Sequence, residues 1–137
     1  MAALLLVVLA VACEGRKSYR AQRFDVQIQV HEDGAATITE TITFAFQGGP
    51  FTYAFREIPL EKTDGISGWT VSEEGQAFVE GKGPGQFEVR RNGDDQRITW
   101  HFEPTQNSRH TYVLSYRVDG LIRQEGQRDA LRWAAIP

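Results

Sequence analysis

The three histidines, His31, His101 and His110, are the side chains best suited to metal binding or proton transfer. His101 and Glu103 are two positions apart, so both would point from the same face of a strand. An imidazole and a carboxylate on one face can contact a metal ion, but a zinc centre needs three or four ligands. We therefore expect a solvated strand face here and no metal site.

Adjacent carboxylates could supply the acid and the base of a glycan hydrolase. The pairs Glu73-Glu74 and Asp94-Asp95 lie in segments that we expect to be loops or turns, where carboxylates are usually solvated. The chain also lacks the GxSxG and HExxH motifs and a cysteine–histidine nucleophile pattern. These observations predict no catalytic residue and no cofactor, so we do not expect an enzyme.

A glycine-rich stretch, GKGPG at residues 81–85, could cradle a phosphate only in a suitable structural setting. A P-loop has the spacing GxxxxGK[ST] between a strand and a helix, and neither the spacing nor a helical pattern is present. We expect residues 72–85 to form a flexible surface loop.

Glu40 is charged at a position where an apolar residue would be expected. It lies between Ile38 and Ile42 in the alternating pattern of one predicted strand, so its carboxylate would point into the core or toward its rim. A buried carboxylate needs a partner, and Arg56 in the neighbouring run is the natural candidate. The alternative is that Glu40 lies at an edge and reaches water.

The strands that position Glu40 are predicted to form a hairpin over residues 24–46. Apolar residues alternate with polar ones on both sides of Glu32-Asp33-Gly34. The two apolar sets face one core only if Val30 lies opposite Ala36, Ile28 opposite Ile38 and Phe24 opposite Ile42. This register needs a loop with an odd number of residues, which a three-residue turn with Gly34 in the left-handed conformation supplies.

A second hairpin is predicted over residues 87–102, because Asn92-Gly93 is a strong signal for a two-residue loop. This loop would pair opposite charges across the strands: Arg91 with Asp94, Arg90 with Asp95, and Glu88 with Arg97. The apolar residues of both strands, from Phe87 to Phe102, would then share the other face.

Further strands are predicted over residues 51–60, 69–71 and 112–121, and another is expected to begin at Leu131-Arg132-Trp133. No helical periodicity follows residue 18. We therefore expect an all-β fold: an antiparallel β-sandwich of about eight strands with Greek-key-like connections and an immunoglobulin-like architecture.

The N-terminal residues are predicted to export the chain. Residues 1–12 contain an apolar run that ends in Ala10-Val11-Ala12, as in the h-region and cleavage site of a signal peptide. Cys13 is then either the first residue after ordinary cleavage or the lipid-modified residue of a weak lipobox, and residues 13–18 are a polar lead-in. The net charge of −3 argues against nucleic-acid binding.

Six segments occur in an order that is fairly specific. They are Phe24-Asp25-Val26 with Glu32-Asp33-Gly34, Thr39 to Thr43, Phe55 to Leu60, Ile98-Thr99-Trp100, His110 to Val118, and Leu131-Arg132-Trp133. Over residues 18–137 the chain thereby resembles the extracytoplasmic N-terminal domain of the predicted membrane proteins called domain of unknown function 2207. The resemblance implies a β-sandwich ectodomain over residues 19–137 that is truncated at its C-terminal end. It also implies attachment to a membrane through helices absent from this chain.

The expected function is that of a non-catalytic extracytoplasmic domain of a membrane-associated protein, in the periplasm or at the cell surface. It would bind a protein or a cell-envelope ligand through the loop regions 47–65 and 72–85. One alternative is a cell-wall or glycan hydrolase, which would need converging acids of raised pKa. Another is a carbohydrate-binding module that uses Trp69 and the tyrosines on an exposed platform.

Overall fold

The described residues of the computed structural model, 17–125 and 128–131, form strands and turns with no helix. The strands are β1 (Ser18–Val30), β2 (Ala36–Gln47), β3 (Phe51–Pro59), β4 (Gly65–Glu73), β5 (Gln76–Ala77), β6 (Val79–Glu80), β7 (Gln86–Asn92), β8 (Asp95–Thr105), β9 (Ser108–Asp119), β10 (Ile122–Glu125) and β11 (Arg128–Leu131).

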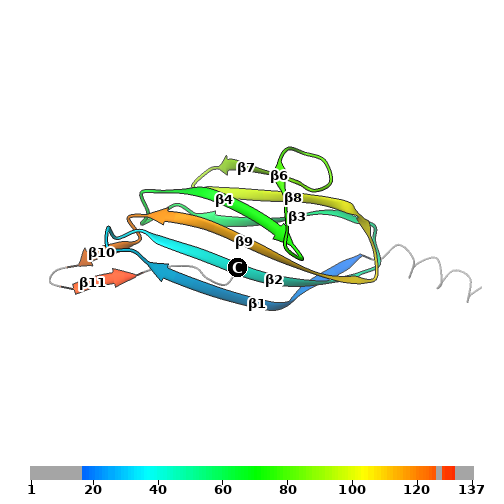
Figure 1. Ribbon diagram of the computed structural model, residues 1–137, viewed down its shortest axis with the longest axis horizontal. Coiled ribbons are helices and arrows are strands. Elements are labelled where there is room, and N and C mark those ends of the chain that lie inside the picture. Colours follow the sequence, from blue (N-terminus) through cyan, green and yellow to red (C-terminus); the bar gives the residue numbers. More distant parts are fainter. Residues whose placement is uncertain (1–16, 126–127, 132–137) are drawn as a thin grey trace, which may run out of the picture.

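Two sheets pack face to face (Figure 1). One has five strands in the order β1-β2-β9-β4-β5, the other has four in the order β3-β8-β7-β6, and β10-β11 is a separate hairpin. All pairings are antiparallel except that of β6 with β7. The all-β sandwich is therefore confirmed, and its two sheets hold nine strands where about eight were expected.

The β1–β2 hairpin has the register that the alternating pattern predicts. Val30 lies opposite Ala36, Ile28 opposite Ile38 and Phe24 opposite Ile42. The amide of His31 donates to the carbonyl of Ala35 at 2.8 Å, which closes a three-residue turn. Gly34 in that turn has a φ of +86°, the left-handed conformation that the register required.

The register predicted for the second hairpin is wrong. Asn92 is the last residue of β7 and pairs with Asp95, so the loop is Gly93-Asp94. Gly93 has a φ of +63°, and glycine at the first loop position suits a type II′ turn. This register also places Phe87 opposite Trp100 and Val89 opposite Ile98, so apolar side chains pair directly.

The predicted charge pairs Arg91–Asp94, Arg90–Asp95 and Glu88–Arg97 are therefore absent, and Arg90 lies opposite Arg97. Both arginines find carboxylates elsewhere. Arg97 binds Glu57 of the neighbouring strand β3, with its Nε 2.8 Å from Oε1. The Nε of Arg90 lies 3.3 Å from Oε1 of Glu88 on its own strand. The apolar face, rather than cross-strand charge, sets this register.

Residues 72–85 contain more strand structure than the predicted surface loop. Strand β4 continues to Glu73, and β5 and β6 follow. The amide of Gly85 donates to the carbonyl of His101 at 2.9 Å, and that of Gly83 donates to the Gln86 side chain at 2.8 Å. The glycine-rich stretch thus folds onto the four-stranded sheet.

The core consists of two apolar clusters. One surrounds Trp100, Tyr112 and Leu114, and the other surrounds Ile38, Ile58 and Val118. On β2, Glu40 lies between Ile38 of one cluster and Ile42 of the other. A charged residue therefore occupies the junction of the two clusters.

Candidate functional site

Glu40 and Arg56 form an ion pair inside the sandwich. Glu40 has 0% and Arg56 5% of its surface exposed. The guanidinium donates twice to the carboxylate, from Nε to Oε1 at 2.9 Å and from Nη2 to Oε2 at 3.1 Å. The expected partner is therefore the observed one, and the alternative of a solvated edge carboxylate is wrong.

Two neighbours complete this pair and were not predicted. The Tyr116 hydroxyl donates to Oε2 of Glu40, and the Phe24 ring lies 5.5 Å from the guanidinium carbon of Arg56. Tyr116 reaches Glu40 because β9 lies beside β2, with Ile38 opposite Tyr116. A carboxylate held by three donors and shielded from water has no access to a substrate, so we assign the cluster a structural role.

A second polar cluster links β4, the β8–β9 turn and β9. Glu73 Oε2 lies 2.6 Å from His110 Nδ1, and His110 Nε2 lies 3.1 Å from Thr105 Oγ1. Thr105 Oγ1 is in turn 2.5 Å from Ser108 Oγ. Such a chain of hydrogen-bonding groups, from hydroxyl to imidazole to carboxylate, is the arrangement that activates a nucleophile.

The surroundings of His110 do not suit that chemistry. Its ring lies among those of Phe46, Phe102 and Tyr112, at centroid distances of 6.0–6.4 Å. The open groove beside Ser108 is lined also by Asn107 and Arg109 but does not include His110. Burial, with a smaller effect of Glu73, raises the pKa of Tyr112 and keeps that phenol neutral. Sequence reasoning missed this cluster because Glu73 reaches His110 only through the β4–β9 pairing.

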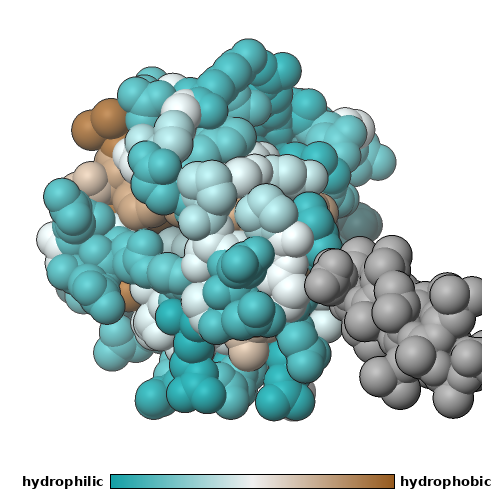
Figure 2. Space-filling view, turned by 90° about the vertical axis from the view of Figure 1, so that its right-hand side faces the viewer, coloured by the Kyte–Doolittle hydropathy of each residue, from teal (hydrophilic) through white to brown (hydrophobic). Residues whose placement is uncertain are grey.

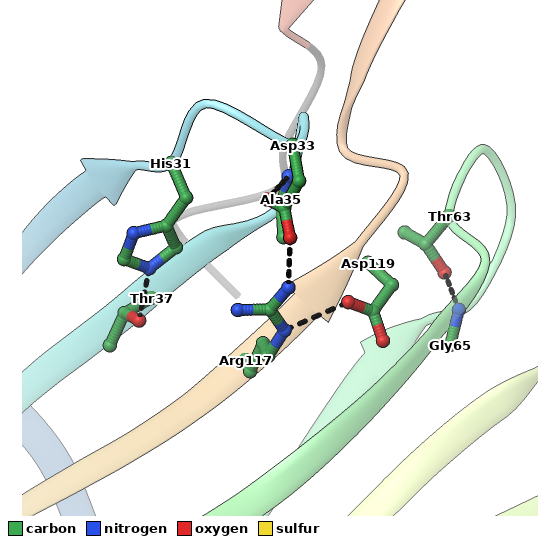
Figure 3. A network of polar contacts seen from close by, with 8 residues as sticks. All are labelled: His31, Asp33, Ala35, Thr37, Thr63, Gly65, Arg117 and Asp119. Atoms are coloured by element: carbon green, nitrogen blue, oxygen red, sulfur yellow. Dashed lines mark hydrogen bonds and ion pairs between the residues drawn. The ribbon is translucent and has the colours of Figure 1, made fainter.

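A third polar network joins the β1–β2 turn to the end of β9 (Figure 3). Arg117 donates to Asp33 at 2.6 Å and to Asp119 at 2.9 Å. The Ala35 amide, and then Arg117, lower the pKa of Asp33, while Asp119 and Asp33 raise that of Arg117. His31 Nε2 contacts Thr37 Oγ1 at 2.7 Å nearby. The network holds the β1–β2 turn against the end of β9.

The carboxylates singled out from the sequence do not converge. Glu73 contacts His110, Glu74 lies in the turn after β4, and Asp94 lies in the β7–β8 turn, whereas Asp95 belongs to β8. Hydrogen bonds from Arg97 and then Asn92 lower the pKa of Glu57. A general acid of a glycan hydrolase needs a raised pKa. The resolved shifts of Asp33 and Glu57 are in the opposite direction.

The sequence-predicted His101–Glu103 pair is also not part of a cluster. The His101 ring lies 6.3 Å from that of Tyr53 on the outer face of the four-stranded sheet. Among the residues whose side chains the structure describes, 17–122, no group of three histidine, cysteine or carboxylate side chains is arranged to hold a metal ion.

An open groove of about 280 Å³ lies between the edge strands β1 and β3. Its lining is mainly aromatic: Tyr19, Phe44, Phe46, Phe51, Tyr53 and Phe55, with Lys17, Pro50, Thr52 and Ala54. The rings of Phe46 and Phe51 are 4.7 Å apart, and Lys17 Nζ lies 5.7 Å from the centre of the Phe51 ring. This groove is a candidate binding site. Its β3 side, residues 50–55, lies within the predicted region 47–65, but the part contributed by residues of β1 and β2 was not predicted, because β1 and β3 belong to different sheets.

The groove opens near the end of the sandwich where β1 begins. Figure 2 views that end, and most of its coloured surface is hydrophilic or intermediate in hydropathy, with brown confined to small areas. The groove therefore offers aromatic surface close to a polar end face.

A sequence model of one family, described as the predicted membrane protein (DUF2207) N-terminal domain, matches residues 20–137. The chain belongs to this family. Comparisons with curated proteins and with solved structures found no significant match. Within the described residues, the DUF2207 domain has no helix that is long and apolar enough to cross a membrane.

The loops expected to form the binding surface of the DUF2207 domain do not lie together. Residues 47–50 precede β3 and contact Asn107, whose side chain accepts from the amide of Gly48 at 2.9 Å. Residues 60–64 follow β3, and there the Asp64 amide donates to the Asp119 carbonyl at 2.7 Å. The nine residues of β3 separate the two turns by about 3.3 Å per residue, so they lie at opposite ends of the sandwich.

The tryptophans of the DUF2207 domain do not form an exposed platform where they are described. Trp100 is fully buried, and Trp69 packs on Tyr116 with ring centres 4.5 Å apart. Trp133, residues 1–12 and Cys13 lie outside the described residues.

Proposed function

We propose that this DUF2207 domain is a non-catalytic, extracytoplasmic binding module of a membrane-associated protein. We further propose that it binds an extended segment of a cell-envelope protein in the groove between β1 and β3. The observation that carries the proposal is the aromatic groove of about 280 Å³ between two edge strands. Membership in a membrane-protein family supports membrane association.

The groove has the properties of a peptide site rather than of a packing defect. Tyr19 at its rim is 62% exposed, although its ring lies 6.3 Å from that of Phe51 in an edge-to-face arrangement. Pockets lined by aromatic side chains with few polar groups are typical of ligand sites. An apolar side chain of the partner would fill the groove.

The free edge of β3 supplies the second part of the proposed site. Among the described strands β3 pairs only with β8, so its other edge presents main-chain donors and acceptors beside the groove. A strand added there gains affinity from main-chain hydrogen bonds and specificity from the pocket. We therefore expect an extended partner segment with an aromatic or aliphatic anchor residue.

The extracytoplasmic location rests on the N-terminal sequence. The apolar run of residues 2–12, followed by a polar lead-in, is typical of an export signal. The non-catalytic assignment is supported by the lowered pKa values of Asp33 and Glu57 and by the packing of the His110 ring against aromatic rings.

One observation favours a carbohydrate-binding alternative. Tyr53 and Phe55 are exposed and adjacent on the outer face of β3. However, the Arg97 guanidinium lies 4.4 Å from the centre of the Phe55 ring and covers one of its faces. A sugar would have to displace this arginine, so we favour the peptide site.

The groove can be tested with the full chain and the dye 8-anilinonaphthalene-1-sulfonate, which is aromatic and anionic. Thr52→Glu places in the groove a charge of the same sign as that of the dye, and Tyr19→Ser removes its rim. We expect each variant to weaken dye binding at least fivefold. Val79→Ser is the matched control, because Val79 is as exposed as Tyr19 but does not line the groove. Equal binding by all four proteins would contradict the proposal.

The partner itself can be sought by placing a photo-crosslinking amino acid at Thr52 in cells. We expect adducts to a cell-envelope protein that disappear when Tyr19 is replaced by Ser. The same crosslinker at Val79 is the control. Adducts that form equally from both positions would show that the groove is not the binding site.

A further inference from the structure

The four edges of the two sheets differ in how they are protected. β5 and β6 contain two residues each. β3 has an irregularity between Phe51 and Tyr53 and ends at Pro59. β1 has 13 residues, and its pairing with β2 is regular from Arg23 to Val30. Short strands, bulges and prolines hinder the pairing of two long folded edges, although a short extended segment can still add to β3; the regular part of β1 lacks these devices.

The regular part of β1 also carries apolar side chains that its own sandwich covers incompletely. Phe24, Val26 and Ile28 are half-buried, and Val30 is 52% exposed. They alternate with Asp25, Gln27 and Gln29, which face outward. A row of partly covered apolar residues beside a free main-chain edge is suited to receive another strand of the same pattern.

The sequence of this edge is self-complementary in the antiparallel direction. A twofold axis at Gln27 places Val26 beside Ile28 of the second copy and Phe24 beside its Val30. The same axis places Asp25 beside Gln29 of the second copy, so no like charges oppose each other along the regular stretch. Twofold dimers use one surface patch in both copies, which requires this kind of self-complementarity.

Two neighbouring positions of the twofold axis pair these residues less completely. An axis at Val26 would place Val30 of one copy opposite residue 22 of the other, in the irregular part of β1. An axis at Ile28 would carry Phe24 beyond the strand and opposite Glu32 in the turn. Only the axis at Gln27 keeps residues 24–30 of both copies within the regular strand.

From these observations we propose that two copies of this chain pair through β1, antiparallel and centred on Gln27, to form a continuous ten-stranded sheet. The irregularity between Ala21 and Arg23 limits the interface to residues 23–31. Tyr19 lies beyond that irregularity, so each copy keeps its aromatic groove accessible. The dimer therefore presents two grooves, but the pairing does not depend on the groove function.

A charge-swap experiment tests the axis directly, using chain exported and purified from a secreting host. Gln27 is exposed, so Gln27→Lys and Gln27→Glu leave the fold of each copy unchanged. Each variant places two like charges beside each other at the axis. Sedimentation velocity should show a dimer for the wild type and at least a tenfold higher dissociation constant for either variant. Mixing the two variants should restore a dimer.

Two controls separate the axis from general effects of charge. Gln29→Lys lies on the same strand face but would meet Asp25 of the second copy, so this variant should remain dimeric. Thr39→Lys lies opposite Gln27 on β2, one strand away from the edge, and should also remain dimeric. A monomeric wild type at 100 μM, or a dimer that Gln27→Lys leaves intact, would overturn the proposal whatever the outcome of the groove experiments.

Discussion

Removal of either partner of the Glu40–Arg56 pair should destabilise the domain strongly. In Glu40→Gln the guanidinium of Arg56, 5% exposed, loses both charge-assisted hydrogen bonds and keeps the Glu57 carbonyl, which accepts from Nη1 at 3.0 Å. In Arg56→Met the buried Glu40 carboxylate keeps only the Tyr116 hydroxyl of the donors described above. Breaking a buried pair typically costs about 3–5 kcal/mol, and we expect each variant to fall in that range.

The double variant Glu40→Gln/Arg56→Met should lose much less than the sum of the two single variants. No buried charge is left unpaired in it, and Met fills part of the volume of the arginine stem. We expect a coupling energy of about 2–3 kcal/mol, which is large for neighbouring residues. Tyr116→Phe should cost about 1.5–3 kcal/mol alone, because its hydroxyl donates to a charged acceptor.

Urea unfolding followed by tryptophan fluorescence provides the free energies, since Trp100 is fully buried in the core. The matched control is the exposed pair Arg23–Asp25. Arg23 Nε lies 2.6 Å from Asp25 Oδ2, and the two side chains are 72% and 54% exposed. Arg23→Met should change stability by about 0.5 kcal/mol or less. A coupling energy near zero for Glu40 and Arg56 would refute the argument that the pair is held by mutual charge compensation.

Three other results are expected. Gly34→Val should cost more than about 1 kcal/mol in urea unfolding, because a β-branched residue is strained at a φ of +86°; an unchanged midpoint would contradict this. The pKa values of Asp33 and Glu57 are lowered in the folded domain. These carboxylates therefore stabilise the fold above their ordinary pKa values of 3.8 and 4.5, and this stabilisation is lost as pH falls through the folded values. The double variant Asp33→Asn/Glu57→Gln should show a smaller loss of stability over that pH range. Mass spectrometry of exported protein should show loss or membrane retention of residues 1–12; a cytoplasmic protein starting at Met1 would refute export.

Local signals in the sequence were sufficient where turn chemistry and the burial pattern agreed. In the β1–β2 hairpin, alternating residues and Gly34 both require the same register, and that register is observed. In the β7–β8 hairpin the Asn92-Gly93 signal and the cross-strand charges favoured a register that the apolar residues do not adopt. Exposed charge pairs contribute little energy, so direct pairing of Val89 with Ile98 outweighs them.

Contacts between distant strands could not be predicted from local patterns. The position of Glu40 within β2 indicated burial, and proximity in sequence indicated Arg56. Tyr116, by contrast, reaches Glu40 only because β9 inserts between β2 and β4. The aromatic groove likewise depends on which strands form the edges of the two sheets. Periodicity assigns residues to faces, but it does not specify the order of strands within a sheet.

The central position of β9 has a consequence for the way the chain folds as it is synthesised. Thr43 of β2 and Thr111 of β9 contact each other although they are 68 positions apart. While the chain emerges with its N-terminus first, the β1–β2 hairpin can form, but the five-stranded sheet stays incomplete until residues 108–119 follow. Folds dominated by such distant pairings form slowly. The strand order thus makes completion of the five-stranded sheet a late event, which waits for β9 to be synthesised.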